Sequence, residues 1–231
     1  MQWLTDILQS LSAKKLDSEP MSVQYGEWPA KQVQKVEVQA NAELWAEITG
    51  KAFPSRSESE YKPVIDALCA AWPIDTPYMD AAQFAYAIAT IEHECGFESK
   101  AEQRANPNLD NHNRLIWGMQ NRYWHTGYYG RGLSQLTWRD NYVLFGRLLS
   151  LPLASKPDLV IDVEVGARIV LIGMWHGLFT GRRIDKYISA GEGRNRWNRA
   201  RAVYNGDVSK NGPKIGQAAQ KIYNEWKRQK S

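Results

Sequence analysis

Hydrophobic residues return every three or four positions in the segment before Gly96. The residues at this spacing are Phe84, Ile88, Ile91 and Cys95. The pattern is typical of a helix that buries one face. Asp75-Thr76-Pro77 predicts its start, because a capping side chain is followed by a proline preset for the first turn. We therefore predict a helix from this tripeptide to about Cys95, ended by Gly96.

Three other segments are expected to be helical, and a loop separates the first two. Asn41 can cap a short helix that runs to Thr49 and ends at Gly50. The loop, Phe53 to Glu60, is rich in proline, serine and charge, and Tyr61 to Trp72 follows it. A longer apolar helix is expected from about Val163 to Phe179. We therefore divide the chain into an N-terminal extension, residues 1–58, and a main domain, residues 59–231.

The first 15 residues carry an apolar stripe of their own. It consists of Trp3, Leu4, Ile7, Leu8 and Leu11. Such a stripe is typical of a docking or core face. The segment lacks the basic start and continuous apolar core of a signal peptide, and no apolar run is long enough to cross a bilayer. We expect the protein to accumulate inside the cell that makes it, and Glu27-Trp28-Pro29 to form a turn.

The composition is that of a globular protein. Of 231 residues, 43% are hydrophobic and 11% are aromatic. The two cysteines, Cys69 and Cys95, lie in apolar helical context and are expected to be free thiols. The four histidines are His93, His112, His125 and His176, and they do not form a His-Glu-x-x-His spacing. A zinc peptidase or amidase is therefore not favoured, and we expect neither a metal nor an organic cofactor.

Positive charge is concentrated near the end of the chain. Residues 181–231 contain 13 Lys and Arg against 4 Asp and Glu. Within them, Arg194, Arg196, Arg199 and Arg201 lie around Trp197. A basic segment of this kind suits an anionic polymer as partner.

Glu94 is a candidate general acid because of its place at the end of the predicted helix. It lies three residues after Ile91, at the edge of the apolar stripe and in the last turn. Partial desolvation and the negative end of the helix both favour the neutral form of a carboxyl group. Glu92 points about 200° away around the helix and is expected to be a solvated or structural charge. The alternative for Glu94 is an ordinary helix-end carboxylate.

The run from Tyr128 to Trp138 begins 34 residues after Glu94. Gly130 and Gly132 allow the backbone to come close to a ligand or another strand. Arg131 between them can hold a carboxylate. The surrounding aromatic rings, amides and hydroxyls suit the apolar faces and hydroxyls of sugars. The run therefore indicates polysaccharide binding, with core packing and a surface ion pair as the alternative.

Together these segments resemble the signature of family 19 glycoside hydrolases, which include plant-type chitinases and a branch of phage and bacterial endolysins. The matching runs are His93-Glu94-Cys95-Gly96-Phe97, Tyr129-Gly130-Arg131-Gly132, Gln135-Leu136-Thr137, Asn141-Tyr142, Pro157-Asp158-Leu159-Val160 and Asn205-Gly206. They follow the family's order and cover roughly residues 60 to 231. The resemblance implies a mainly α, two-lobed lysozyme-like fold with a substrate cleft between the lobes.

The resemblance also implies hydrolysis of a β-1,4 bond between amino sugars with inversion. The glutamate of the His-Glu pair is the general acid of the family, which here is Glu94. Inversion needs a second carboxylate about 6.5 to 9.5 Å from the first, with room for a water. The family spacing makes Glu102 the candidate general base. Glu98 and Asp110 are alternatives, because the segment after Glu102 departs from the family pattern.

Further residues are assigned to the substrate by the same resemblance. They are Tyr129, Arg131, Gln135, Asn141 and Asn205. In relatives, the positions of Gln135 and Asn141 orient substrate or water, Tyr129 is a cleft aromatic, and Asn205 lines the cleft from the second lobe. The family arginine near the C-terminus has no clear match, since Lys221 falls only nearby.

The sequence thus predicts a phage or prophage enzyme that cleaves the glycan strands of bacterial peptidoglycan. A chitinase and a lytic transglycosylase are close alternatives. A non-catalytic wall-binding virion protein and a basic nucleic-acid-binding protein are alternatives of other classes. We favour the wall over nucleic acid because no nucleic-acid motif accompanies the arginines. The protein is expected to remain a monomer in the host cytoplasm until lysis, or to attach to virion proteins through its extension, without stable membrane insertion.

Overall fold

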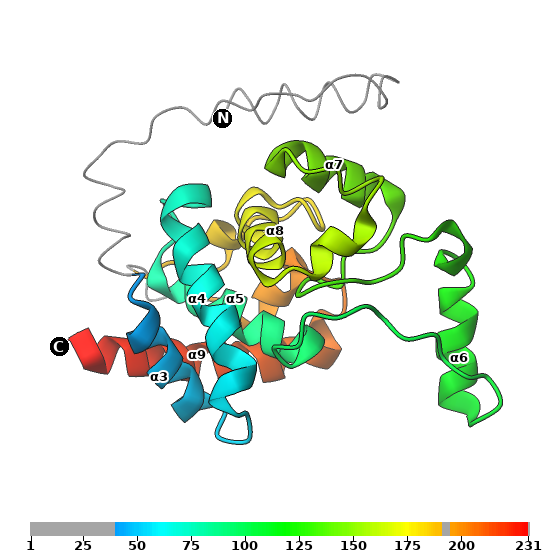
Figure 1. Ribbon diagram of the computed structural model, residues 1–231. Helices are drawn as coiled ribbons and strands as arrows, with labels where there is room; N and C mark the ends of the chain where they lie inside the picture. Colours follow the sequence, from blue (N-terminus) through cyan, green and yellow to red (C-terminus); the bar gives the residue numbers. More distant parts are fainter. Residues whose placement is uncertain (1–39, 191–194, 231) are drawn as a thin grey trace. The chain divides into compact units, whose positions relative to one another are not determined.

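The computed structural model describes residues 40–190 and 195–230, and these are mainly helical (Figure 1). The α-helices are α3 (Ala42–Ala52), α4 (Glu58–Asp75), α5 (Ala81–Cys95), α6 (Asn111–Gln120), α7 (Arg139–Leu149), α8 (Val163–His176) and α9 (Val208–Lys230). Short 3-10 helices are η1 (Trp124–Thr126), η2 (Pro157–Ile161), η3 (Ile184–Lys186) and η4 (Trp197–Val203). Within the described residues, β pairing is limited to an isolated antiparallel bridge between Ala101 and Arg131. The predicted mainly α fold class is confirmed.

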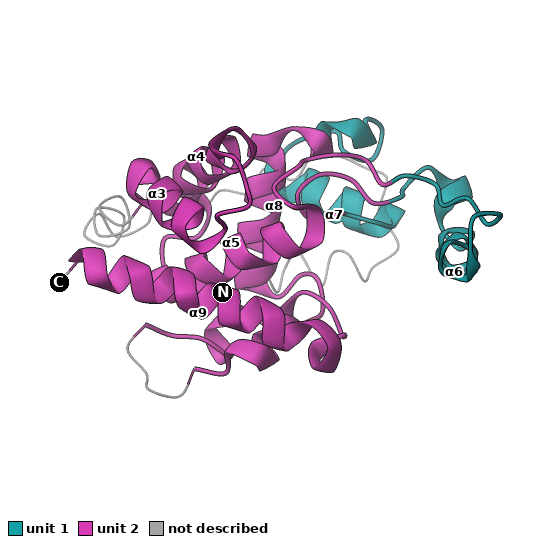
Figure 2. Ribbon diagram, turned by 90° about the horizontal axis from the view of Figure 1, so that it is seen from below, with its two compact units in different colours: residues 1–27, 103–129, 136–159 teal, residues 28–102, 130–135, 160–231 magenta. Residues whose placement is uncertain are grey.

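The described chain divides into two compact units, which Figure 2 shows in different colours. Its first unit contains residues 103–129 and 136–159. The second contains residues 40–102, 130–135, 160–190 and 195–230. Glu94, Glu102 and the glycine-flanked Arg131 therefore all belong to the second unit.

Helices α3, α4, α5, α8 and α9 pack around the core of the second unit. Trp72 of α4 stacks on Phe84 of α5 with 4.0 Å between ring centroids, and Trp45 of α3 meets Phe84 at 4.9 Å. Every residue of α5 from Ala81 to Ile91 is buried. Close packing of this kind holds a helix rigidly, so the last turn of α5 offers a fixed position for a functional side chain.

Helix α5 ends before Gly96 as predicted, but its predicted start was wrong. The N-cap is Asp80, whose side chain accepts from the backbone N–H of Ala82 and Gln83 at 2.9 and 3.0 Å. Asp75 is instead the buried last residue of α4, and its two oxygens accept from Arg168 at 2.7 and 2.8 Å. The side chain that resembled a cap is used in an ion pair that only the tertiary fold creates.

Helix α3 begins as predicted after Asn41, whose side chain accepts from the N–H of Leu44 at 3.0 Å. The helix does not end at Gly50, which makes room for Tyr61 instead. A β-carbon on Gly50 would lie 2.5 Å from the Tyr61 hydroxyl oxygen. Although α3 lies before residue 58, its Trp45 is fully buried in the core of the second unit.

Two other boundaries differ from the sequence prediction. Helix α4 begins at Glu58, inside the expected loop, because Glu60 reaches back to accept from the backbone N–H of Ser57 at 2.7 Å. Helix α8 ends at His176, before the predicted Phe179, because Gly177 takes the left-handed conformation with φ 73°.

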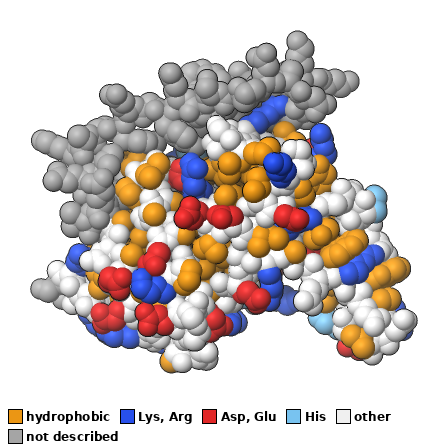
Figure 3. Space-filling model, viewed as in Figure 1, with side chains coloured by type: hydrophobic (Ala, Val, Ile, Leu, Met, Phe, Trp, Pro, Cys, Tyr) orange, Lys and Arg blue, Asp and Glu red, His pale blue; other side chains and the backbone are white. Residues whose placement is uncertain are grey.

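The first unit contains α6, η1 and α7. Tyr142 of α7 is fully buried, and its hydroxyl lies 2.9 Å from the carbonyl oxygens of both Tyr129 and Leu136. In contrast, α6 buries only Gln120. Its exposed apolar side chains include Leu115 at 69% and Met119 at 57% exposure, and Figure 3 shows apolar side chains at the surface there.

Some expectations fall on residues that the structure does not describe. These are the stripe from Trp3 to Leu11, the turn at Glu27-Trp28-Pro29, and Arg194. Among the helices of residues 40–190 and 195–230, none is both long and apolar enough to cross a membrane.

Candidate active site

Glu94 lies in the last turn of α5, where the helix ends tightly against Gly96. Gly96 has a left-handed φ of 62° and donates its N–H to the carbonyl of Glu92 at 2.9 Å. A β-carbon on Gly96 would lie within 2.7 to 3.0 Å of the Arg56 guanidinium. The Glu94 side chain is 16% exposed, so its carboxyl group is shielded on most sides and still reachable from solvent.

The neighbouring carboxylate Glu92 behaves as expected for a structural charge. Its Oε1 accepts from Arg56 at 3.0 Å, and its side chain is 14% exposed. Glu92 and Glu94 therefore have similar exposure and different partners.

Arg201 of η4 is the direct partner of Glu94. Its Nη1 donates to Glu94 Oε1 at 2.5 Å, while its Nε and Nη2 donate to the two oxygens of Asp207 at 2.5 and 3.2 Å. Asn211 of α9 also donates to Asp207. The Arg201 side chain is only 2% exposed, so the guanidinium is held in one place between two carboxylates.

The electrostatics of this triad keep Arg201 charged. Burial alone would lower the pKa of Arg201, but the hydrogen bonds and charges of Asp207 and Glu94 outweigh burial and raise that pKa. The hydrogen bond from Arg201 lowers the pKa of Asp207. Arg201 is therefore a permanent cation in contact with Glu94, an influence that the sequence argument for Glu94 did not include.

Tyr204 joins the triad to the glycine-flanked loop, residues 130–135. Its hydroxyl donates to the carbonyl oxygen of Ser134 at 2.6 Å, and the Arg201 guanidinium lies 5.6 Å from its ring centroid. Burial raises the pKa of Tyr204 well above its ordinary range, so the hydroxyl remains a donor. Because Tyr204 contacts both segments, the second unit brings the His-Glu pair and part of the glycine motif together.

Three buried polar atoms around these segments have no hydrogen-bond partner among the described residues. They are the Tyr86 hydroxyl, His93 Nδ1 and Ser134 Oγ. Burial is the main cause that raises the pKa of Tyr86, and the charges of Arg201 and Asp207 act on it as well. Buried groups of this kind normally have a hydrogen-bond partner, which is often an ordered water.

Glu102 lies on the segment that pairs with the glycine-flanked loop. Its N–H donates to the carbonyl of Gly130 at 2.7 Å, and its Oε2 accepts from the N–H of Gly130 at 3.1 Å. Gln135 donates through Nε2 to the carbonyls of Lys100 and Gly132 at 3.1 and 3.0 Å. Both predicted site residues, Glu102 and Gln135, therefore help to fix the loop.

Gly132 is needed for the close approach of this loop to Val160 in η2. Its φ is 69°, and a β-carbon there would lie 2.1 Å from the carbonyl oxygen of Val160. The predicted role of Arg131 as a substrate contact meets a difficulty, because this side chain is only 4% exposed. Arg131 therefore has little surface to offer a polymer.

Tyr129 and Asn141 lie in the first unit. The Tyr129 ring stacks on Trp124 with centroids 4.3 Å apart, and the Arg104 guanidinium lies 5.1 Å from the Trp124 ring. Asn141, in the first turn of α7, donates its Nδ2 to the carbonyl of Thr137 at 2.7 Å. One face of the Tyr129 ring is therefore covered by Trp124, and only its other face is open to an apolar contact.

Glu98 and Asp110, the alternatives to Glu102 as general base, both have other partners, and Asn205 is at the surface. Glu98 is 65% exposed and forms an ion pair with Lys100 at 2.5 Å. Asp110 caps α6 by accepting from the N–H of Asn113 at 2.7 Å, a bond that lowers its pKa. Asn205 is exposed and follows η4, four residues after Arg201.

Sequence reasoning missed Arg201, Asp207 and Tyr204 as members of this site. Arg201 was grouped with the surface arginines near Trp197, and its burial corrects that assignment. One available signal was their nearness in sequence to Asn205-Gly206, which carried part of the family resemblance.

Comparisons with known proteins find one local similarity. A stretch of 48 residues is 46% identical to Basic endochitinase B of Arabidopsis thaliana. It covers 21% of this chain and 14% of the plant protein, so the match spans a small part of that relative. No protein-family model and no solved structure match the chain. The similarity is local, and it falls on the class of enzyme that the sequence motifs resemble.

Proposed function

We propose that the protein is a glycoside hydrolase that cleaves β-1,4 bonds between amino sugars, with Glu94 as general acid. The observation that carries the proposal is the pairing of a reachable carboxyl group with a buried guanidinium that a second carboxylate orients. Glu94 contacts Arg201 at 2.5 Å, and Asp207 holds Arg201 through two hydrogen bonds. Such a fixed arrangement is what positioned proton transfer requires.

Proton donation by Glu94 would break the glycosidic bond at the leaving oxygen. The proton moves to that oxygen as the bond to the anomeric carbon breaks, and Glu94 is left as a carboxylate. Arg201 then stabilises the new negative charge at hydrogen-bond distance. Asp207 does not touch the substrate in this scheme and acts as a positioning residue for Arg201.

Glu102 is proposed as the general base of an inverting reaction. A water attacks the anomeric carbon from the face opposite the leaving group, and Glu102 takes one of its protons. Support comes from its place beside Gly130, in the loop whose Ser134 bonds to Tyr204. Glu98 and Asp110 are weaker candidates, because the first is paired with Lys100 at the surface and the second caps α6.

Contacts with the sugar chain are assigned to Tyr129, Gln135, Asn141 and Asn205. Tyr129 offers a ring face next to Trp124, and the three amide side chains can donate and accept hydrogen bonds. Arg131 is omitted, because its burial suits a role inside the loop better than one at the substrate.

The proposed substrate is the glycan strand of bacterial peptidoglycan, and the proposed context is phage lysis or cell entry. Residues 1–58 would then hold the enzyme to other virion proteins through the part that precedes α3, since α3 itself packs in the core of the second unit. A chitinase is the second candidate, which the local identity to Basic endochitinase B favours. The two activities share their bond chemistry and differ in the lactyl-peptide branch of peptidoglycan.

Digesting purified peptidoglycan and chitin side by side tests the proposal. We expect new reducing ends from peptidoglycan, at a rate that Glu94→Gln abolishes. Faster release from chitin would favour the second candidate. Binding to both polymers without cleavage of either would contradict a hydrolase of either kind and would favour a wall-binding protein.

A further inference from the structure

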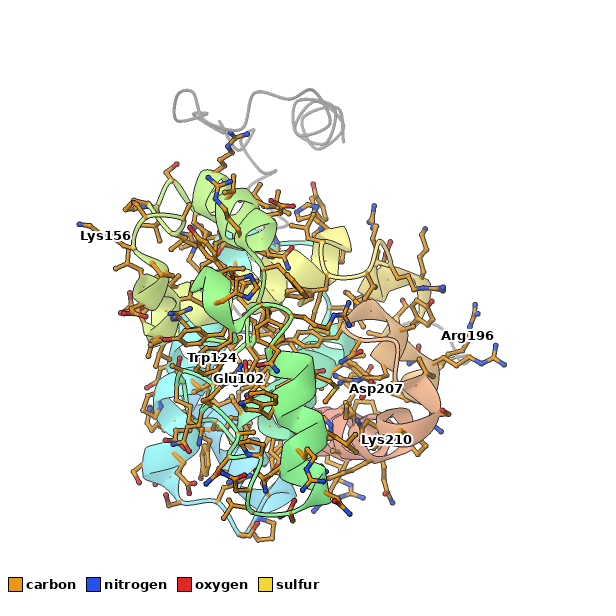
Figure 4. All side chains as sticks on the ribbon, turned by 90° about the vertical axis from the view of Figure 1, so that its right-hand side faces the viewer. Glu102, Trp124, Lys156, Arg196, Asp207 and Lys210 are labelled. Atoms are coloured by element: carbon orange, nitrogen blue, oxygen red, sulfur yellow. The ribbon has the colours of Figure 1, made fainter. Side chains whose placement is uncertain are left out.

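A basic pocket in the second unit is lined by residues that follow α8 and by residues of η4 and the segments next to it. Its volume is about 470 Å³, and its lining includes Arg182, Arg196, Arg199, Tyr187, Thr180 and Gly206. The three arginines are exposed, and Figure 4 shows Arg196 pointing outward from the segment before η4. The basic pocket differs from the Glu94 site, since neither Glu94 nor Arg201 lines it.

Hydrogen bonds give the basic pocket a defined frame. Thr180 donates through Oγ1 towards the carbonyls of Ala202 and Val203, at 2.7 and 2.9 Å. Arg182 donates through Nη1 to the Tyr187 hydroxyl at 3.1 Å. The Thr180 bonds connect the chain after α8 to the end of η4, so the pocket is built from two segments that are bonded to each other.

The charge of the basic pocket is not balanced by its own lining, because the described residues that line it include no Asp or Glu. Two described carboxylates that are close in sequence to the lining have other partners. Asp185 pairs with Arg183 at 3.0 Å, and Asp207 pairs with Arg201. Three guanidinium groups around one opening repel one another and create a field that attracts anions. Planar guanidinium groups fit carboxylate and phosphate oxygens in particular.

The basic pocket is close in sequence and structure to the Glu94 triad. Gly206 and Val208 line it, and Asp207 between them holds Arg201. Arg199 precedes Arg201 by two residues in η4. An occupant of the pocket would therefore contact the same short segment that orients the partner of Glu94.

We propose that the basic pocket binds an oxyanion, a carboxylate or a phosphate, carried by the polymer on which the enzyme acts. This inference rests on the proposed function and deepens it, because it names a substrate class. Peptidoglycan strands carry carboxylates on their peptide branches and are joined to phosphate-rich polymers in many walls, whereas chitin is neutral. The pocket thus favours an acidic wall glycan over chitin.

Binding experiments with the full chain test this inference. All variants carry Glu94→Gln so that substrates persist. The pocket variant adds Arg182→Gln, Arg196→Gln and Arg199→Gln. The matched control adds Lys156→Gln, Arg228→Gln and Lys230→Gln, which removes the same charge from exposed residues outside the pocket lining. The ligands are soluble peptidoglycan strands with intact peptides, the same strands with amidated carboxyl groups, a glycerol phosphate polymer, and neutral N-acetylglucosamine hexamer.

The pocket variant should bind at least one anionic ligand at least about tenfold more weakly, the effect of losing one charge-assisted hydrogen bond. The control should lose no more than about twofold, as expected for exposed charges. A loss with intact strands that amidation removes identifies a carboxylate as the ligand, and a loss with the phosphate polymer alone identifies a phosphate.

Two results would overturn the inference. Equal losses in the pocket variant and the control would mean that only net charge matters. An equal loss for the neutral hexamer would mean that the arginines contact the sugar chain itself. Digestion of peptidoglycan by the unmodified chain is a separate measurement, so a failure of the proposed hydrolase activity is distinguishable from a failure of the pocket.

Discussion

At the scale of single residues, the candidate site depends on Arg201. A guanidinium that is 2% exposed needs charged partners, because an unpaired buried charge is strongly destabilising. Glu94 and Asp207 supply these partners from the end of α5 and the start of α9. The same contacts that stabilise the fold therefore fix the position of the proposed acid.

The first prediction concerns Glu94 itself. Glu94→Gln keeps the size of the side chain and a hydrogen-bond acceptor for Arg201, but it cannot donate the catalytic proton. Wall lysis should fall by at least about a hundredfold, the usual scale for general acid catalysis, while circular dichroism stays the same. Glu92→Gln is the matched control, since Glu92 has similar exposure in the same helical turn. Near-normal lysis by a folded Glu94→Gln protein would remove Glu94 from the mechanism.

The second prediction concerns Arg201 as a partner of the acid. Arg201→Lys keeps the charge but loses the planar guanidinium group, which donates to Glu94 and Asp207 at the same time. We expect kcat to fall by about tenfold or more, the scale of one lost charge-assisted hydrogen bond, with little change in KM. The alkaline limb of the kcat profile against pH, along which a general acid loses its proton, should also shift. An unshifted profile with a lower melting temperature would indicate a purely structural role.

At this scale the sequence nominated individual residues for the site but not the partners that the fold gives them. Glu94, Glu102 and Gln135 could be singled out because local motifs surround them. Arg201 could not, since the contact with Glu94 spans 107 positions of the chain and depends on how α5, η4 and α9 pack. Composition around Trp197 made Arg201 resemble its exposed neighbours Arg196 and Arg199.

At the scale of elements, the loop of residues 130–135 depends on a backbone that only glycine allows. Gly132 has φ 69° and lies against the Val160 carbonyl, whereas Gly127 has φ 80° with open space around its Cα. Gly132→Ala should therefore lower the free energy of unfolding by about 2–5 kcal/mol, through overlap added to strain. Gly127→Ala should cost only the strain, about 1–2 kcal/mol.

Urea unfolding of both glycine variants, followed by circular dichroism, measures this difference. The loss should be larger for Gly132→Ala, and activity should fall with it because the loop also positions Glu102 through Gly130. Equal losses for the two variants would show that the close approach to Val160 does not matter for stability.

The end of α8 gives a prediction about pH. Burial, reinforced by the charge of Arg183, lowers the pKa of His176 from 6.5 to about 4. Between these values the unfolded chain binds a proton that the folded protein excludes, so stability is lost as pH falls from about 6.5 to about 4. The full effect is at most about 3 kcal/mol. His176→Gln should flatten this part of the stability curve, and an unchanged slope would contradict the assignment.

The limits of helices were predicted well where one residue decides them. Gly96 ended α5 as expected, and Asn41 capped α3. Prediction failed where tertiary packing decides the boundary. Gly50 leaves room for the Tyr61 side chain, and Asp75 forms an ion pair with Arg168. A local sequence pattern shows which helix boundary a residue can form, but a contact with a residue far away in the sequence can give it a different role.

At the scale of the whole molecule, basic residues near the end of the chain lie in two different environments. Residues 181–231 carry 13 basic side chains, but Arg201 is neutralised inside the fold. Arg182, Arg196 and Arg199 remain exposed around the basic pocket. A polymer with negative charge would therefore be attracted next to the segment that orients the proposed acid.

The last prediction concerns the reaction that the protein performs on such a polymer. Hydrolysis by inversion places one atom of solvent oxygen at the new reducing end. A lytic transglycosylase needs only one carboxyl group, and its product is a 1,6-anhydro end that lacks one water. Digestion in water labelled with heavy oxygen should give labelled reducing ends with inverted anomeric configuration, which mass analysis and nuclear magnetic resonance detect.

Glu102→Gln then tests the proposed base, because an amide cannot accept the proton of the attacking water. Activity should fall by at least about a hundredfold, while binding persists, since Gln can still accept the Gly130 N–H bond that Glu102 makes. Glu98→Gln is the control, as its exposed ion pair with Lys100 contributes little. Anhydro ends would refute hydrolysis. Labelled products from an unimpaired Glu102→Gln protein would transfer the role of the base to Glu98 or Asp110, which their own variants would then reveal.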